Sequence, residues 1–367
     1  MWQIVYLEQT MFFNYKQNIV EATQMYMQRA LELAKLGAGN VSPNPMVGCV
    51  VVHQGKIVGE GYHRKYGEGH AEVNAINSVR DKSILSQSQL YVTLEPCSHY
   101  GKTPPCADLI IKHQIPEVFV AVKDPNPLVA GNGIKKLEDA GIKVHCGILE
   151  AEATELNKRF FTAIQKKRPY IILKWAETAD GFIARKNYDS KWISSVFSRT
   201  LVHKWRAEED AILVGTNTAL KDNPQLNVRQ WDGRNPTRVV IDRNLVLPDT
   251  LKFFDGSQDT ILFYSKGISP VQDHNKKFGV AIEGSFLEGV TQELFNRKLH
   301  SVIIEGGAQL LNAFIEEGLW DEAKIFKSKT LFGDGISAPV LNQKASVVLK
   351  SIEQSDTDYL MTYTNNL

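Results

Sequence analysis

Apolar residues recur along the chain with two spacings, one typical of helices and one typical of buried strands. Between residues 21 and 36, Met27, Leu31 and Ala34 fall on one helical face, and two glycines follow. Further on, short apolar runs alternate with helical segments. We expect strands at 46–52, 56–62, 89–94, 117–122 and 142–148, and helices that begin near residues 70, 106 and 133. This alternation predicts an α/β layered sheet with crossover helices.

The alternation starts again after a basic, proline-containing segment, KKRP at 166–169. Residues 149–165 before it have the pattern of one amphipathic helix. After it come strands such as YIILKWA and SVIIE and helices such as SRTLVHKWRAEED and AQLLNAFIEEG. We therefore predict an N-terminal extension at 1–21, a first α/β domain at 22–166 and a second at 167–367.

Positive and negative charges nearly cancel over the 367 residues, with 42 Lys and Arg against 41 Asp and Glu. Nucleic-acid binders usually carry a basic excess, so we expect no nucleic-acid partner. No run of about 18 apolar residues occurs, so we expect no membrane segment. The first residues lack the pattern of a secretory signal, so we expect a cytoplasmic protein.

The four cysteines allow either two disulfides or free thiols, and a cytoplasmic location favours the thiols. Cys49 and Cys146 lie in apolar runs and are predicted to be buried in the core. Cys97 and Cys106 lie among prolines, glycine and polar residues, where we expect chemistry.

His70, Cys97 and Cys106 form a candidate metal site with Glu72 beside it. One imidazole and two thiolates suit zinc and leave a fourth position for water, whose pKa the cation lowers. Glu72, near a predicted helix start, can carry a proton from this water to a leaving nitrogen. H-x-E followed by P-C is the signature of zinc-dependent deaminases. The alternative is a closed structural site with His99 as the fourth ligand.

The loop between the two cysteines departs from the usual C-x-x-C, because eight residues separate Cys97 from Cys106. Lys102 in this loop suits an anionic substrate, or it is a solvated lysine. Asn44, between two prolines, offers a donor and an acceptor to a ring edge, or it forms a turn. His63 can face the same pocket or cap a strand.

The second domain lacks the G-x-G-x-x-G dinucleotide fingerprint. It has instead Gly306 and Gly307 between a predicted strand and a predicted helix, where a phosphate can approach the helix N-terminus. A plain turn is the alternative. Arg206 and Arg229 are candidates for a substrate phosphate, because guanidinium pairs with phosphate bidentately, or they are surface arginines.

Three segments of the first domain, SPNPMVGCVVV, GYHRKYGEGHAEVNAI and YVTLEPCSHYGKTPPCADLII, closely resemble the bifunctional riboflavin biosynthesis deaminase–reductases. The second domain resembles them through KWAETADGFIA, SKWISS, RAEEDAILVGTNTALKDNPQLNVR and IIEGGAQLLNAF, so the match runs from about residue 22 to near the end. The resemblance implies a cytidine-deaminase-like three-layer α/β/α domain followed by a dihydrofolate-reductase-like α/β domain. One departure is Glu177-Thr178-Ala179, where small residues and Ser are more usual.

The resemblance also implies two consecutive reactions on small phosphorylated pyrimidines. The first domain would use Zn²⁺ to deaminate 2,5-diamino-6-ribosylamino-4(3H)-pyrimidinone 5′-phosphate. The second would use NADPH to reduce 5-amino-6-(5-phosphoribosylamino)uracil to the ribityl compound.

Residue roles follow from the same resemblance. It makes His70, Cys97 and Cys106 zinc ligands, Glu72 the proton carrier, and Asn44, His63 and Lys102 deaminase substrate residues. It places Ser190, Arg206, Leu226, Arg229 and Glu305 near the reductase substrate, and Ala176, Trp192, Thr218, Asp222, Gly306 and Gly307 at NADPH, while Lys174 and Asp180 fall in the first strand motif.

Three other hypotheses make different predictions. A tRNA or nucleoside deaminase fused to an unrelated domain predicts C-x-x-C and, for tRNA, a basic face. A zinc-stabilised binding module predicts four protein ligands and leaves Glu72 without a task. A degenerate fusion would keep only one active half. We also expect a homo-oligomer.

Overall fold

The computed structural model describes residues 20–100, 104–126, 129–190, 193–268, 276–341 and 346–366. The chain folds into two compact units that divide between Gln165 and Lys166. Of the predicted N-terminal extension, residues 1–19 lie outside the described residues. Residues 20 and 21 belong to a helix that continues to residue 35.

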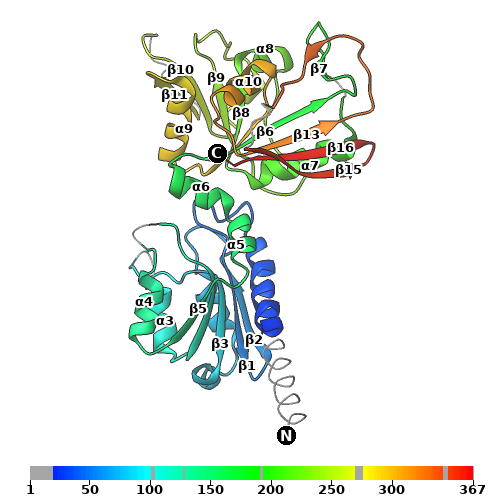
Figure 1. Ribbon diagram of the computed structural model, residues 1–367. Coiled ribbons are helices and arrows are strands. Elements are labelled where there is room, and N and C mark those ends of the chain that lie inside the picture. The colour runs from blue at the N-terminus through cyan, green and yellow to red at the C-terminus, as the bar shows by residue number, and fades with distance from the viewer. Residues whose placement is uncertain are drawn as a thin grey trace. The chain divides into compact units, whose positions relative to one another are not determined.

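The N-terminal unit is built on a five-stranded sheet of order β2-β1-β3-β4-β5 (Figure 1). β1 pairs antiparallel with β2 and β3, whereas β3, β4 and β5 are parallel. The strands are β1 (Gly48–His53), β2 (Lys56–Tyr62), β3 (Gln89–Leu94), β4 (Glu117–Val122) and β5 (Lys143–Cys146). The helices after the first are α2 (Ala71–Ser78), η1 (Lys82–Gln87), α3 (Cys106–Lys112), α4 (Asn132–Asp139), α5 (Glu150–Leu156) and α6 (Lys158–Lys166).

Alternating side chains of β1 enter two different cores, one on each face of this sheet. Cys49 and Val51 pack with residues of α2, α3 and α4. Val50 and Val52 pack with residues of helix 20–35, α5 and α6. The unit therefore has the predicted three layers, with helices on both faces of the sheet.

Two predictions for this unit are wrong. The expected single helix at 149–165 divides at Asn157 into α5 and α6. Cys146 is exposed, because it is the last residue of edge strand β5, whereas Cys49 in the inner strand β1 is buried as predicted.

The C-terminal unit is built on a nine-stranded sheet of order β11-β10-β9-β8-β12-β6-β13-β16-β15. Its strands are β6 (Tyr170–Glu177), β8 (Ala211–Gly215), β9 (Thr237–Ile241), β10 (Thr260–Ser265), β11 (Lys277–Ile282), β12 (Ser301–Ile304), β13 (Glu322–Lys327), β15 (Val347–Ser355) and β16 (Asp358–Asn365). The pairs from β11 to β13 are parallel, and β16 runs antiparallel to β13 and β15. A separate ribbon joins β7 (Phe182–Ala184) to β14 (Ile336–Ser337).

Helices cover both faces of the larger sheet too (Figure 1). They are α7 (Val196–Glu208), α8 (Thr216–Asp222), η2 (Lys252–Phe254), α9 (Phe286–Asn296) and α10 (Ala308–Glu316). Ile171 and Leu173 of β6 pack with α9 and α10 residues, whereas Tyr170 and Ile172 pack with α7 and α8 residues. Because most strands are parallel, their carboxyl ends lie along one edge of the sheet, where sites form in such folds. No helix in the described parts of the chain is long and apolar enough to cross a membrane.

Candidate active sites

Three segments of the N-terminal unit bring His70, Cys97 and Cys106 together. His70 is the N-cap of α2, Cys97 follows β3, and Cys106 is the first residue of α3. The Nδ1 atom of His70 lies 3.6 Å from Cys97 Sγ and 3.3 Å from Cys106 Sγ. All three ligand atoms lie within 4.8 Å of one another. Ligands of a tetrahedral zinc stand roughly 3.5 Å apart, given metal–ligand bonds of about 2.0–2.3 Å, so this donor set fits the cation.

The two thiols and the imidazole also prepare the site for a cation by hydrogen bonding. Bonds from Cys106 and His70 lower the pKa of the Cys97 thiol, which favours the thiolate that zinc binds. In the described part of the chain, His99 is exposed and is not a member of this ligand group. The geometry thus offers three protein ligands, as a catalytic zinc requires.

Glu72 lies directly beside these ligands. It stands in the first turn of α2, its side chain is only 3% exposed, and it contacts the Cys106 thiol. Burial raises the pKa of this carboxyl to about 7, and the charge of Cys97 raises it too. A carboxyl with a pKa near neutrality can both accept and release a proton.

Asn44 and His63 form one connected pair at the same site. Asn44 Nδ2 lies 3.2 Å from His63 Nε2, and His63 Nδ1 lies 3.2 Å from the Gly69 carbonyl. The His63 ring packs edge-on against the ring of His70, a candidate metal ligand, with centroids 5.6 Å apart. Both residues are therefore placed within reach of a ring bound at the metal. Lys102 lies outside the described residues.

Two buried polar residues that the sequence analysis missed hold the loops of this site. Glu95, 4% exposed, accepts hydrogen bonds from the backbone amides of Gly131, Gly133 and Ile134 at 2.9–3.3 Å, which ties the segment before Cys97 to α4. A Cβ at position 133 would lie 1.9 Å from the Pro96 carbonyl oxygen, so this close approach requires the glycine. In the sequence, the only local sign of this role is that the acidic Glu95 directly follows the buried strand β3.

Asn157 holds the loop that carries Asn44. Its side chain accepts from the Met46 amide and donates to the Met46 carbonyl, both at 2.8 Å. Asn157 is 2% exposed, and it stands at the point where α5 ends. Nothing near residue 157 in the sequence indicates a partner 111 residues away.

The C-terminal unit contains a cavity of about 1000 Å³ at the carboxyl ends of β6, β8, β9 and β12. The structure brings most of the predicted reductase residues to its wall. These are Ala176, Ser190, Arg206, Thr218, Asp222, Arg229, Glu305, Gly306 and Gly307, with Lys174 among them. Trp192 lies outside the described residues.

Lys174, Arg206 and Glu305 form a charged cluster in the wall of the cavity. Arg206 Nε and Nη2 donate to the two carboxylate oxygens of Glu305 at 2.7 and 2.8 Å, and Lys174 Nζ lies 3.7 Å from Glu305 Oε2. Although burial opposes ionisation, Arg206 and Lys174 lower the pKa of Glu305 to about 2. The bidentate face of Arg206 is thus occupied by Glu305, and a bidentate phosphate clasp by Nε and Nη2 is not available.

The glycine turn after β12 has the geometry of a phosphate cradle. Gly307 is the N-cap of α10, and its amide donates to Thr218 Oγ1 at 2.9 Å. A Cβ on Gly306 would lie 2.9 Å from Leu310 Cδ2, so a side chain there would require the Leu310 side chain to move. The cavity beside this helix N-terminus, where two consecutive residues are glycines, suits the pyrophosphate of a dinucleotide.

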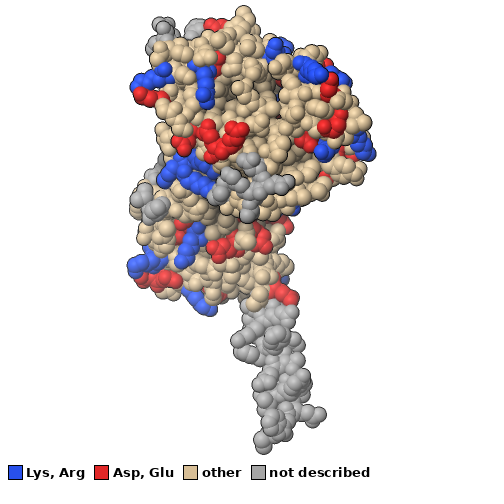
Figure 2. All heavy atoms as spheres, turned by 45° about the horizontal axis from the view of Figure 1, so that its top comes forward, with Lys and Arg blue, Asp and Glu red and all other residues tan. Residues whose placement is uncertain are grey.

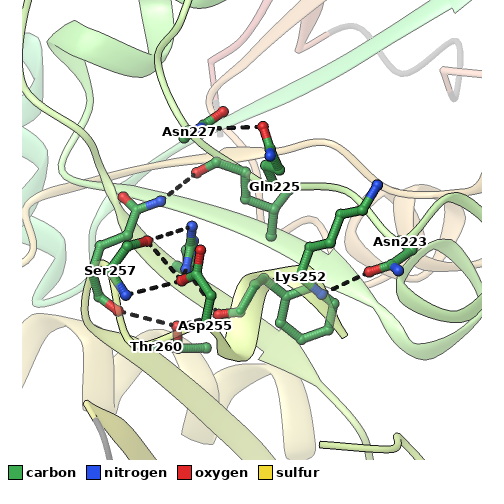
Figure 3. A network of polar contacts seen from close by, with 11 residues as sticks. Asn223, Gln225, Asn227, Lys252, Asp255, Ser257 and Thr260 are labelled. Atoms are coloured by element: carbon green, nitrogen blue, oxygen red, sulfur yellow. Dashed lines mark hydrogen bonds and ion pairs between the residues drawn. The ribbon is translucent and has the colours of Figure 1, made fainter. Parts of the chain in front are cut away.

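The loop after α8 is anchored away from the cavity. Asn223 and Leu226 have left-handed backbone conformations, and Asn223 Oδ1 accepts from the Lys252 amide at 2.8 Å (Figure 3). Leu226 is 2% exposed and packs in the core with Phe253. Leu226 therefore fixes the loop and does not line the cavity, and its contact with substrate stays a prediction.

His203, which the sequence analysis did not single out, holds the far end of this loop. Its Nδ1 accepts from the Arg229 amide at 3.5 Å, and Arg206 Nη1 donates to the Asn227 carbonyl at 3.2 Å. Burial lowers the pKa of His203 to about 4, as do the charges of Arg206 and Arg229. A neutral His203 and the charged Arg206 thus present Arg229 at the cavity.

The unusual Glu177-Thr178-Ala179 segment makes structural contacts. Glu177 accepts hydrogen bonds from Trp175 Nε1 and Lys327 Nζ, both at 3.0 Å. Asp180, which follows it, accepts from the Gly333 amide at 2.7 Å and does not belong to the cavity wall. These residues shape the turn after β6.

Comparison with known proteins matches a separate family model to each of the two units of the chain. The model of the cytidine and deoxycytidylate deaminase zinc-binding region matches residues 20–122, and that of the RibD C-terminal domain matches 169–361. The riboflavin biosynthesis protein RibD of Aquifex aeolicus is 42% identical over 341 residues, covering 92% of this chain and 94% of that protein. RibD of Escherichia coli is 36% identical over 333 residues, covering 84% and 88%.

Solved structures agree over nearly the whole chain. A diaminohydroxyphosphoribosylaminopyrimidine deaminase/5-amino-6-(5-phosphoribosylamino)uracil reductase of Thermotoga maritima is 38% identical, with a TM-score of 0.86, and covers 94% of this chain and 99% of its own. RibD of Acinetobacter baumannii is 36% identical, with a TM-score of 0.86, and covers 95% and 100%.

Proposed function

The chain belongs to the RibD family of riboflavin biosynthesis proteins, and we propose that its two units catalyse a zinc-dependent deamination followed by an NADPH-dependent reduction. The substrates are 2,5-diamino-6-ribosylamino-4(3H)-pyrimidinone 5′-phosphate and its deamination product, 5-amino-6-(5-phosphoribosylamino)uracil. The observation that carries the proposal is the convergence of His70, Cys97 and Cys106 with Glu72 buried beside them.

In the deaminase, three of the four residues would bind the metal and the fourth would move the proton. His70, Cys97 and Cys106 would hold a zinc ion, whose chemistry when bound is to lower the pKa of a water molecule toward neutrality. Glu72 would accept a proton from the attacking water and deliver it to the amino group, which would leave as ammonia while the water oxygen takes its place on the ring. Burial of Glu72 suits this role because it keeps the proton affinity of the carboxylate high.

Asn44 and His63 orient the pyrimidine ring. The contact with the Gly69 carbonyl fixes the His63 ring, with Nε2 toward Asn44. The pair can therefore offer hydrogen bonds to a ring edge next to the metal. Lys102 would pair with the substrate phosphate by charge.

In the reductase, NADPH supplies the hydride and the protein aligns the two bound molecules. Gly306, Gly307 and Thr218 form the pyrophosphate site, with Ala176, Asp222 and Trp192 completing the cofactor site. Ser190, Leu226 and the charged cluster of Lys174, Arg206 and Glu305 face or support the substrate. Arg229 is the better candidate for the substrate phosphate, because Arg206 is bound to Glu305.

Charge and thiols support the remaining parts of the proposal. On the face in Figure 2, basic and acidic side chains lie interspersed, as expected of an enzyme for small molecules and not of a nucleic-acid binder. Metal-binding thiols suit the reducing cytoplasm.

The edge strand β15 offers a surface on which a second copy of the chain could pack. Its Val348 and Ile352 side chains are 45% and 57% exposed, and a second copy covering them would give a homo-oligomer.

The test is to incubate zinc-loaded protein with the diaminopyrimidine substrate, with and without NADPH, and to follow ammonia release and nicotinamide absorbance. We expect ammonia in both cases and NADPH oxidation only after deamination. The Glu72→Gln variant should keep its zinc and lose about 10²–10⁴-fold in deamination rate. Glu152→Gln, a change at an exposed position of α5, is the matched control. Unchanged turnover of Glu72→Gln would defeat the assignment.

A further inference from the structure

A buried carboxylate, that of Asp358, contacts the start of α7 and has no assigned task. Asp358 is the first residue of β16 and is 2% exposed. Its Oδ2 atom accepts one hydrogen bond from the Ser195 amide and another from the Ser198 hydroxyl, both at 2.7 Å. Hydrogen bonds to an ionised acceptor are stronger than those between neutral groups. These two bonds therefore link β16 strongly to a segment 160 residues before it.

The first turn of α7 is built around this carboxylate. Ser195 is the N-cap of α7, and its Oγ accepts from the Ser198 amide at 3.1 Å. The Ser198 hydroxyl is fully buried and also lies 2.9 Å from the hydroxyl of Ser355, the last residue of β15. A negative charge is favourable at a helix N-terminus, because the free backbone N–H groups there form the positive end of the helix dipole. The hairpin of β15 and β16 therefore fixes the place where α7 begins.

The helix that starts at this contact forms part of the reductase cavity. Four of its residues belong to the cavity wall, and these are Arg199, Val202, His203 and Arg206. Residues spaced by three, four and seven positions lie on one face of a helix. Because all four belong to one helix of 13 residues, a shift of its first turn would move the whole face against a molecule bound in the cavity.

Asp358 lies at the edge of the sheet that holds the cavity. Tyr359, the next residue, pairs with Lys327, the last residue of β13, and β13 runs parallel to β6. The start of β16 is therefore beside the carboxyl ends of β13 and β6. Asp358 is not among the described residues of the cavity wall, so it can act on a bound molecule only through α7.

We propose that Asp358 is a positioning residue of the reductase, which holds the first turn of α7 and so places Arg206 and His203 against the pyrimidine substrate. Arg206 binds Glu305, and His203 accepts from the Arg229 amide, so the charged cluster and the loop of Arg229 both depend on this helix. The inference rests on the proposed reductase function, because that function assigns the cavity beside α7 to the pyrimidine.

Reductase kinetics of the full-length protein, with each reactant varied separately, test the inference. The first variant, Asp358→Ala, removes both hydrogen bonds to α7. Asp358→Asn keeps an acceptor oxygen without the charge, and Ser198→Ala removes only the hydroxyl contact. Tryptophan fluorescence in denaturant gives the stability of each variant, and the kinetics are measured at a temperature where all of them are folded.

The control is Asp321→Ala. Asp321 is also a buried aspartate of this unit, and it accepts from the Ile171 amide at 2.9 Å. It directly precedes β13 and so lies at the amino edge of the sheet, opposite the edge that holds the cavity. Asp321→Ala should therefore lower stability without changing either KM, which separates loss of stability from loss of positioning.

Loss of both bonds in Asp358→Ala should raise the KM for the deaminated pyrimidine by about tenfold, with kcat within about threefold. The KM for NADPH should rise less, because Gly307 and Thr218 of the proposed pyrophosphate site belong to other elements. Asp358→Asn and Ser198→Ala should each raise the pyrimidine KM by about threefold. Deamination should stay at the wild-type rate in every variant.

A wild-type pyrimidine KM in both Asp358→Asn and Ser198→Ala would overturn the inference and leave the reductase proposal in place. An equal rise in Asp321→Ala, or an equal rise of the KM for NADPH, would have the same consequence. These two milder variants decide the question if Asp358→Ala does not fold. A wild-type protein that oxidises no NADPH with the deaminated pyrimidine would overturn the reductase proposal itself, and the inference with it.

Discussion

The two active sites differ in how much of the chain each one uses. The proposed zinc ligands and Glu72 lie within residues 70–106, at the starts of two helices and after one strand. The reductase cavity takes its wall from residues spread between Lys174 and Ile336. A site made from short local motifs can be recognised from its spacing, whereas a site assembled from many strand ends depends on the sheet that brings them together.

The difference extends to the contacts that stabilise each site. The deaminase centre depends on a single cation that three ligand atoms within 4.8 Å of one another would share. The reductase site depends on distributed contacts, such as the Arg206–Glu305 pair and the Asn223–Lys252 bond. We therefore expect substitutions to have all-or-none effects in the first site and graded effects in the second.

The largest expected effect comes from Cys106→Ala. Removal of one thiolate leaves two ligands, so zinc content should fall from about one per chain to nearly none, and deamination should be abolished. Elemental analysis of purified protein measures the metal. NADPH oxidation with the deaminated substrate should stay at the wild-type rate. Full zinc occupancy in the variant would contradict the ligand assignment, and Cys146→Ala, a change at the exposed cysteine that ends β5, is the control.

The next effect concerns the buried pair in the reductase. Glu305→Gln leaves Arg206 and Lys174 without their carboxylate, and loss of one partner of a buried pair costs about 3–5 kcal/mol. Five of the six tryptophans lie after residue 166, so tryptophan fluorescence in denaturant reports unfolding of this unit. Zinc content and deamination should not change.

Replacement of both partners separates the charge from the shape of the site. In Arg206→Leu with Glu305→Leu no buried charge remains from the pair, so the double variant should lose less stability than the sum of the two single changes. Single variants as stable as the wild type would show that the pair is solvated and that the reductase site is less buried than its contacts indicate.

The local pattern of the sequence predicted most of the helices and strands of both units. It did not predict the order of the strands in either sheet. β4 is a continuous apolar run and was expected, whereas β13 reads EAKIFK and was missed. β13 nevertheless lies inside the sheet, because Tyr170 donates to Glu322 at 2.9 Å and Lys324 pairs with the same carboxylate. Charged residues that neutralise each other within one strand hide that strand from a pattern of hydrophobicity.

The candidate sites show the same limit. His70, Glu72, Cys97 and Cys106 were predicted from the H-x-E and P-C motif and its strand–helix context, because metal chemistry restricts which residue types can serve. Asn157, Glu95 and His203 act on distant backbone groups, and their partners are set by the fold. The role of Arg206 was expected to be direct, and only the structure shows that Glu305 occupies its bidentate face.

A smaller effect tests whether the deaminase also has a graded component. Asn157→Ala removes both hydrogen bonds to Met46, which cost about 1–3 kcal/mol when left unsatisfied, so the loop of Asn44 should loosen. We expect a KM for deamination raised by about tenfold, with kcat and zinc content retained. Asn157→Asp keeps the acceptor and loses the donor, so its KM should lie between. Loss of zinc in parallel with activity would show that Asn157 supports the whole unit and not the loop.

The smallest effect is the pH dependence that His203 gives to the reductase unit. Its pKa is about 4 in the folded protein, against about 6.5 for a free histidine, so between these values the unfolded state binds more protons. Stability therefore rises with pH across this window and is lost as pH falls, by about 1–2 kcal/mol between pH 7.5 and pH 5. His203→Asn keeps an acceptor for the Arg229 amide but cannot titrate, so its tryptophan-detected unfolding should depend less on pH. An unchanged pH dependence in His203→Asn would mean that the pKa of His203 is the same in the folded and unfolded states, so that burial does not lower it.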